Sequence, residues 1–261
     1  MIPQLTDRTA LTQHRARATR EALFLHEDVA AEAQERLNEV NRTFTDAVVV
    51  TPFPELWPGF RTVPDAEVLE LEPQSQDLVI HALCLHWAND PVGQLVQCRR
   101  ALRPDGLLLC ATLGGQTLHE LRAVLAEAEA AVSGGLSPRV LPMADIRDLG
   151  GLMQRAGLAL PVADTFTRRV TYRDALHLMH DLRAMGETSA LTGRPRHFTK
   201  RSVLMEAARR YHEAFGDADG RVGATVETVW LTGWAPADSQ PQPLRPGSAT
   251  HSLAEALRPK D

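Results

Sequence analysis

The chain has 261 residues, 44% of them hydrophobic and 23% charged, and its formal net charge is −5 at pH 7. These values are typical of a globular protein with room for one large α/β domain. The negative charge argues against a nucleic-acid protein that binds through general basicity, and no apolar run reaches the roughly 18 residues of a membrane-spanning helix. No secretory signal is visible, and the 3 cysteines show no metal-ligand spacing, so we expect a soluble, cytoplasmic protein.

Residues 1–18 form a polar, basic arm that carries several arginines. One interpretation is a solvated arm, and the other is an arm that closes over a site or meets an acidic partner. Residues 19–40 then repeat apolar positions at steps of three and four, which predicts an amphipathic helix. This helix opens a domain that we expect to span residues 19–234.

The first buried strand is predicted at residues 46–50, where alanine is followed by three valines. The next segment, residues 51–76, contains five prolines, so a long regular helix is improbable there. A complete parallel crossover takes at least ~10–12 residues, so at most one further short strand fits before residue 77. The likeliest position for it is residues 65–71, and the first half of the sheet is therefore expected to be shortened.

Residues 77–129 predict a strand, a helix, a second strand and a second helix. The first strand is expected at residues 77–85 and the second at 107–113, both as continuous apolar runs of the kind found in parallel sheets. Asn89 or Asp90 is expected to cap the helix between them. Thr117 and Glu120 have the spacing of a capping box for the following helix. Two such strands joined by a helix form a right-handed βαβ unit.

The C-terminal half is expected to alternate helices and strands. Helices are predicted at residues 145–157, 174–186 and 199–216, and strands at 158–163, 167–172 and 224–234, all from apolar periodicity and capping residues. The two helices within residues 174–216 are expected to form a lid over the sheet. Residues 235–261 form a proline-rich tail for which no regular structure is predicted.

Few residues offer independent catalytic or metal chemistry. His177 and His180 lie at i, i+3 on one predicted helix, but no third ligand at fixed spacing accompanies them, so no metal site is predicted. His86 follows the carboxyl end of a predicted strand, where sites of α/β proteins gather. It either lines the mouth of a site or acts there as a general base, which makes it the one weak catalytic candidate.

Six short motifs along the chain carry a family resemblance. They are LTDR at 5–8, RARA at 15–18, LCLHWAND at 83–90, GGQTLHELR at 114–122, DLGGL at 148–152 and WLTGW at 230–234. Together they resemble the class I S-adenosylmethionine (SAM) methyltransferase family. The resemblance is closest to the methyltransferase-type mitochondrial complex I assembly factors and their bacterial homologues, and more distant to the malonyl-carrier-protein methyltransferases of biotin synthesis.

This resemblance implies a Rossmann-like fold with a mainly parallel sheet, an antiparallel closing strand and SAM as the cofactor. It also implies where the cofactor would lie. Asp65, Ala66 and the following glutamate resemble the acidic motif on the adenine side, and His81, Ala82 and Leu83 follow the strand that borders the methyl donor. The mitochondrial members are described as hydroxylating an arginine of a complex I subunit, so methyl transfer does not follow from the fold alone.

The sequence departs from this family at the first strand. Class I methyltransferases hold SAM above that strand with a glycine-rich turn, whereas this chain has Thr51-Pro52-Phe53-Pro54 there and a single glycine, Gly59, among its first 92 residues. We therefore expect a degenerate SAM site in a protein that acts as an assembly or interaction factor on a protein client. The alternative is an active SAM-dependent methyltransferase or a related protein-arginine hydroxylase.

Overall fold

The computed structural model describes residues 4–241 and contains one six-stranded sheet in the order β2-β1-β3-β4-β6-β5. β1, β2, β3 and β4 are parallel, while β6 runs antiparallel to both β4 and β5. The strands are β1 Ala47–Val50, β2 Arg61–Val63, β3 Gln76–Ala82, β4 Leu102–Leu113, β5 Ala159–Tyr172 and β6 Val222–Trp234. The mainly parallel sheet with an antiparallel closing strand is thus confirmed.

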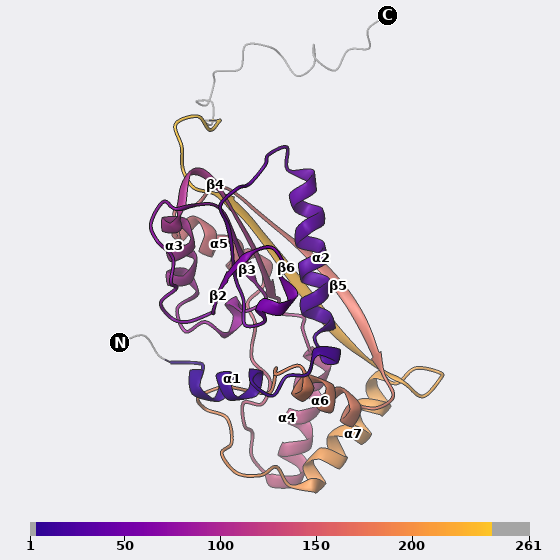
Figure 1. Ribbon diagram of the computed structural model, residues 1–261. Coiled ribbons are helices and arrows are strands. Elements are labelled where there is room, and N and C mark those ends of the chain that lie inside the picture. Colours follow the sequence, from indigo (N-terminus) through magenta and orange to yellow (C-terminus); the bar gives the residue numbers. More distant parts are fainter. Residues whose placement is uncertain (1–3, 242–261) are drawn as a thin grey trace, which may run out of the picture.

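Helices cover both faces of this sheet (Figure 1). The valines of β1 alternate between the faces: Val49 packs in the cluster with α2, whereas Val48 and Val50 pack in the cluster with α3 and α5. The helices are α1 Arg8–Arg15, α2 Phe24–Glu39, α3 Pro91–Ala101, α4 His119–Ser133, α5 Ile146–Arg155, α6 Ala175–Ala184 and α7 Arg201–Phe215, with short 3₁₀ turns at η1 Arg20–Ala22, η2 Pro54–Leu56 and η3 Leu85–Trp87.

α4, α6 and α7 gather beyond the carboxyl ends of the parallel strands, where the long β5 and β6 extend to meet them (Figure 1). Their apolar faces form a separate cluster around Leu178 and Tyr211. The Tyr211 hydroxyl donates to the Gly223 carbonyl oxygen at 2.9 Å, which ties α7 to β6. The predicted helices of residues 174–216 are therefore present, and they lie beside the edge of the sheet where a site is expected.

Local signals in the sequence located several helix boundaries. Asp90, one of the two capping candidates, accepts from the Gly93 amide at 2.8 Å, and Asp145 accepts from the amides of Arg147 and Asp148. The predicted capping box is wrong. Thr117 donates to the Glu227 carbonyl oxygen and accepts from its amide, so its hydroxyl binds β6 rather than the first turn of α4.

The shortened first half of the sheet is observed, but its extra strand lies elsewhere than predicted. Residues 65–71 form no strand; β2 comes before them, and only its three residues extend the sheet beyond β1. Residues 65–71 instead cross toward α3, where the Gln97 side chain accepts from the Leu69 amide at 2.8 Å. Side-chain amides of α3, which both accept and donate, thus replace strand pairing for this segment.

Three further boundaries differ from the predictions. The helix expected over residues 19–40 begins at Phe24, after the turn η1. β4 starts five residues before its predicted first residue. The predicted Pro-Asp-Gly turn is part of this strand, and the pairing with β3 shifts register there. The two strands expected between residues 158 and 172 are one strand, β5, with a register shift near Leu160, where φ is +50°. Most of the predicted proline-rich tail lies outside the described residues.

Candidate functional site

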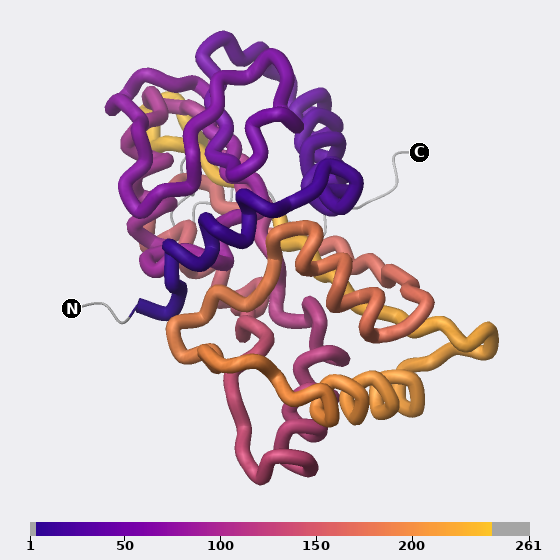
Figure 2. The backbone as a smooth tube through the Cα atoms, turned by 60° about the horizontal axis from the view of Figure 1, so that its bottom comes forward, coloured from indigo at the N-terminus to yellow at the C-terminus, as the bar shows by residue number. Residues whose placement is uncertain are grey.

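The carboxyl ends of β1, β2 and β3 meet at one edge of the sheet, where ligands of doubly wound folds bind. Thr51 follows β1, Asp65 follows β2, and Leu83 follows β3. α1 crosses this edge. Figure 2 shows the indigo N-terminal segment running between the purple part of the chain, which contains β1 to β3, and the orange part, which contains α6 and α7. The candidate site therefore lies beneath α1.

The turn after β1 is filled by its own side chains. Phe53 is 4% exposed, and its ring meets the edge of the buried His26 ring at 4.7 Å between centroids. The Phe53 amide donates to the Thr51 hydroxyl at 3.1 Å, which closes the turn locally. Leu56 and Trp57 are buried in the same cluster on the α2 face. Aromatic and aliphatic groups thus occupy the volume that small residues would leave open.

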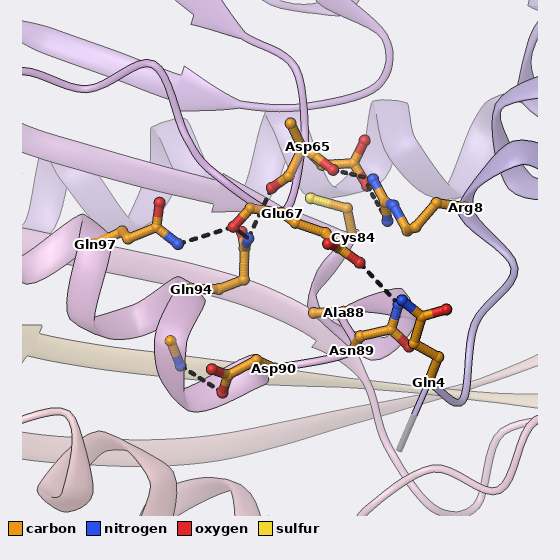
Figure 3. A pocket seen from close by; sticks show the side chains of 12 residues that line it. Gln4, Arg8, Asp65, Glu67, Cys84, Ala88, Asn89, Asp90, Gln94 and Gln97 are labelled. Carbon is orange, nitrogen blue, oxygen red and sulfur yellow. Dashed lines mark hydrogen bonds and ion pairs between the residues drawn. The ribbon is translucent and has the colours of Figure 1, made fainter. Parts of the chain in front are cut away.

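Asp65 is held by two arginines of α1. Arg15 Nη1 lies 2.5 Å from Asp65 Oδ2, and Arg8 reaches both the carboxylate and the carbonyl oxygen of the same residue. Gln94 of α3 donates to the Ala66 carbonyl oxygen at 2.7 Å. Figure 3 shows Arg8 directed at Asp65 on one side of this loop and Gln94 on the other. The predicted residues Asp65 and Ala66 therefore line the site, and Asp65 is already ion-paired within the chain.

His81, Ala82 and Leu83 form the end of β3 and its exit. All three are buried, and Leu83 has a φ of +49°. His81 Nε2 lies 3.3 Å from Gln94 Oε1, and its Nδ1 lies 3.5 Å from the Cys84 sulfur. Burial lowers the pKa of His81 to about 4, so the ring is neutral near pH 7. Leu83 lines a cavity that it shares with the lid.

His86 is joined to the lid by a buried glutamate. His86 Nε2 lies 3.4 Å from Glu187 Oε2, and the Trp87 indole N–H donates to the same oxygen at 2.6 Å. Burial acts to raise the pKa of Glu187, but the His86 hydrogen bond and the nearby charges of His86 and Arg15 outweigh it and lower that pKa to about 2. Glu187 is therefore a buried carboxylate, and His86 is its partner.

The basic arm is folded, and the prediction of a solvated arm is wrong. α1 is capped by Asp7, and Leu11 packs with Trp87 and Leu191. The backbone amide of Asp7 donates to the Ala190 carbonyl oxygen at 2.8 Å, so the arm is pinned to the loop between α6 and α7. The alternative interpretation, an arm that closes over a site, fits this position.

Three cavities surround the edge. The first, of about 250 Å³, is polar and lies between Asp65 and the start of α3; Asn89, Gln94 and Gln97 line it (Figure 3). The second, of about 480 Å³, lies between α1 and the turn after β1 and is lined by Arg15 and Phe53. The third, of about 230 Å³, is mostly apolar and lies between the lid and the sheet.

Among residues 4–241 no group of three or more His, Cys, Asp or Glu side chains could hold a metal ion. His177 and His180 are both exposed on α6. All three cysteines are free and buried. None of the described helices combines the length and apolar character needed to cross a membrane.

Comparison with known proteins defines the class of this fold. The methyltransferase domain family matches residues 25–110. A crystal structure of a methyltransferase from Bacillus halodurans C-125 superposes with a TM-score of 0.50 and 13% identity, covering 78% of this chain and 98% of that one. The chain is thus similar to the methyltransferase domain family over these residues, and it has the class I methyltransferase fold.

Within this class, two groups of curated relatives stand out. Arginine-hydroxylase NDUFAF5, mitochondrial, from Danio rerio is 38% identical over 191 residues, which are 73% of this chain and 59% of the relative. The human protein of that name is 38% identical over 76% of this chain and 57% of its own. Malonyl-[acyl-carrier protein] O-methyltransferase from Laribacter hongkongensis is 38% identical over 66% and 56%. The chain thus matches 56–59% of the length of these relatives.

Sequence reasoning missed three residues that shape the site. Arg15 was one arginine among several in the arm, and nothing in its spacing marked it as buried. Glu187 follows a predicted helix without any motif. Gln94 occupies one turn of an ordinary amphipathic helix, and its amide organises the loop at residues 65–67. Each acts through a partner distant in sequence, so only the fold reveals it.

Proposed function

We propose that this protein is a methyltransferase-family member with a degenerate SAM site that acts as an assembly or interaction factor on a protein client. The observation that carries this proposal is the filled edge of the sheet. Phe53 is buried in the turn after β1, and α1 crosses the same edge with Arg15 paired to Asp65. The resemblance to this family implies a glycine-rich turn after the first strand and an acidic side chain that is free to bind the cofactor.

The residues present do not fit the methionine half of SAM. The polar cavity beside Asp65 has a volume of about 250 Å³, below the roughly 300–1,000 Å³ of typical ligand pockets. The larger cavity is lined by Arg8, Arg15 and Arg20, whose positive charges oppose a sulfonium cation. Asp65, which also lines this cavity, is already paired with Arg8 and Arg15.

The client is proposed to be of the respiratory complex I type, as the resemblance to the assembly factors implies. The lid offers a contact surface for it. Phe198, between α6 and α7, is 99% exposed, and the same segment carries Arg194, Arg196 and Lys200. A fully exposed aromatic side chain among cations is typical of a contact residue.

Affinity capture of the tagged chain from a native source, with bound proteins identified by mass, tests this function. We expect one partner in stoichiometric amount, with or without added SAM. Phe198→Ser should weaken that capture, whereas Phe166→Ser, a change at an exposed phenylalanine of β5, should leave it unchanged. Failure to retain any partner above a tag-only control would contradict the proposal.

The second candidate is an active enzyme, and the relatives favour it. Their names describe an arginine hydroxylase and an O-methyltransferase at 38% identity. In that case Asp65, Ala66, His81, Ala82 and Leu83 would border the cofactor, and His86 would serve as the base. Methyl transfer or hydroxylation of the captured client by the purified chain would establish this alternative.

A further inference from the structure

Cys84 follows β3 directly after Leu83, whose φ is +49°, and its side chain contacts the buried His81. The Cys84 sulfur lies 3.5 Å from His81 Nδ1 and 3.7 Å from the Val50 carbonyl oxygen, so the thiol hydrogen has two acceptors within reach. Cys84 also lines the polar cavity of about 250 Å³ (Figure 3). A thiol, an imidazole and a cavity therefore meet at one point.

The hydrogen bonds of Gln94 determine the tautomer of His81. The Gln94 side-chain nitrogen donates to the carbonyl oxygens of Ala66 and Glu67. Its oxygen is therefore the atom that faces the ring, 3.3 Å from His81 Nε2. An amide oxygen only accepts, so Nε2 carries the ring proton and Nδ1 keeps its lone pair. Because Nδ1 is the atom beside the Cys84 sulfur, His81 can accept the thiol proton.

Both members of this pair rest in their neutral forms. Burial raises the pKa of the Cys84 thiol and lowers the pKa of His81 to about 4, so near pH 7 a thiol lies beside a free base. A cysteine beside a base reacts without prior ionisation, because the base takes the proton as the sulfur attacks. The charged and titratable groups around the pair come from α1, the loop after β2, η3, the start of α3 and β4: Arg8, Arg15, Asp65, Glu67, His86, Asp90 and Cys110.

We propose that Cys84 is a nucleophilic thiol that hydrogen peroxide oxidises to a sulfenic acid, with His81 as its general base and Gln94 as the residue that positions His81. Cys84 is 1% exposed, so only a reagent of a few atoms reaches its sulfur through the cavity. The side-chain amides of Asn89 and Gln97 line this cavity. Such groups suit a small, neutral molecule that both donates and accepts hydrogen bonds, as hydrogen peroxide does.

The oxidation is balanced without a further reactant. The sulfur attacks one oxygen of the peroxide, so an S–O bond forms while the O–O bond breaks. The thiol proton passes to His81 Nδ1 and then to the leaving oxygen, which departs as water. Sulfur is oxidised, the peroxide is reduced, and His81 returns to its neutral form. Neither SAM nor a protein client takes part, so this site is additional to the proposed function.

Treatment of the purified chain with hydrogen peroxide tests this assignment, with dimedone to trap sulfenic acid and mass spectrometry to resolve the three cysteine peptides. Cys84 should be trapped while Cys98 and Cys110 remain thiols, because those two are 0% exposed and line none of the three cavities. The trapping rate should be constant between pH 6 and pH 8, since His81 is neutral throughout. A thiol without a base would react about tenfold faster per pH unit, through its thiolate fraction.

His81→Gln should lower the rate at pH 6 by about 100-fold or more and restore the rise with pH. His26→Gln is the matched control, because His26 is also buried with a pKa of about 4, but its ring packs against Phe53. Gln94→Leu should lower the constant rate, whereas Gln94→Glu, which still accepts from His81 Nε2, should keep it. The pH profile of the wild type tests the base even where a variant is too unstable to fold.

The proposal is overturned if the wild-type rate rises about tenfold per pH unit, or if the three cysteines are trapped together. It is also overturned if His26→Gln slows Cys84 as much as His81→Gln does, because burial rather than the base would then control the thiol. An unchanged rate in Gln94→Leu would overturn the positioning role of Gln94.

Discussion

Two buried histidines at the edge of the sheet, His26 and His81, are kept neutral by their surroundings. Burial lowers the pKa of each to about 4, from an ordinary value of 6.5. Near pH 7 neither ring carries charge, so the positive charge at this edge comes from arginines, Arg8, Arg15 and Arg20. The chemistry of the site at the residue scale is therefore that of arginine and carboxylate pairs among neutral rings.

These histidines predict an acid-sensitive fold. Between pH 6.5 and about 4 the unfolded chain binds protons that the folded chain does not, so the free energy of unfolding falls as the pH is lowered through this window. Each group contributes a slope of at most ~1.4 kcal/mol per pH unit. Urea titrations at several pH values measure the free energy of unfolding and therefore this slope.

His81→Gln should reduce that slope, and His180→Gln, at an exposed position on α6, should not. A second loss of stability is expected below pH 4.5. There Glu187 is protonated in the unfolded chain, whereas in the folded chain its pKa is about 2. A stability that is flat from pH 7 to pH 4 would contradict the burial of both rings.

Gln94 is the side chain that fixes the loop at residues 65–67. Its amide donates to the carbonyl oxygens of Ala66 and Glu67. Gln94→Ala leaves the Ala66 carbonyl oxygen without this donor, although Gln97 still donates to that of Glu67, and should lower the free energy of unfolding by about 1–3 kcal/mol. Gln34→Ala is the control, because Gln34 makes one exposed contact to Asn38. Equal effects of the two changes in urea unfolding would show that the loop does not depend on Gln94.

At the scale of elements, α4 and β6 are joined by polar side chains that the sequence indicated for another role. The Glu120 carboxylate accepts from the Thr225 amide and from its hydroxyl, the latter at 2.5 Å. It is 4% exposed, although the capping-box spacing predicted a bond within the first turn of its own helix. α4 is thus attached to the closing strand through buried hydrogen bonds.

Glu120→Ala tests that attachment. It leaves the Thr225 donors unpaired and should cost about 1–3 kcal/mol of unfolding free energy, with a larger effect on hydrogen exchange in β6 than in β1. Glu127→Ala changes an exposed glutamate of the same helix and should cost far less. An exchange pattern that changes equally in β1 and β6 would contradict a local role for Glu120.

The sequence predicted well those elements that local patterns specify. The valine run of β1, the apolar runs of β3 and β4, and the caps of α3 and α5 depend on neighbouring residues, and all are present. Residues 65–71 alternate enough to predict a strand, but side chains of α3 satisfy their backbone instead. Arg15 and Glu187 escaped prediction because their partners lie 50 or more residues away in the chain.

At the scale of the whole molecule, the similarity to methyltransferases favours an enzyme, whereas the contents of the candidate cofactor site favour a protein without SAM. The chain has the class I methyltransferase fold and is 38% identical to a curated relative over 73% of its own length. At the edge where the cofactor would lie, β1 has only the short β2 on its outer side, the buried Phe53 lies in the turn, and Arg15 is paired with Asp65. The proposed loss of the cofactor site rests on these side chains.

Calorimetric titration of the purified chain with SAM tests this account most directly. We predict no binding tighter than ~100 μM, which corresponds to about −5.5 kcal/mol. The same titration of Arg15→Ala separates two cases. SAM binding in this variant alone would show that Arg15 blocks an otherwise intact site. No binding in either protein would show that the site itself is absent, since Phe53 still fills the turn in the variant. A dissociation constant well below ~100 μM for the wild-type chain would contradict the degenerate site and favour the active enzyme.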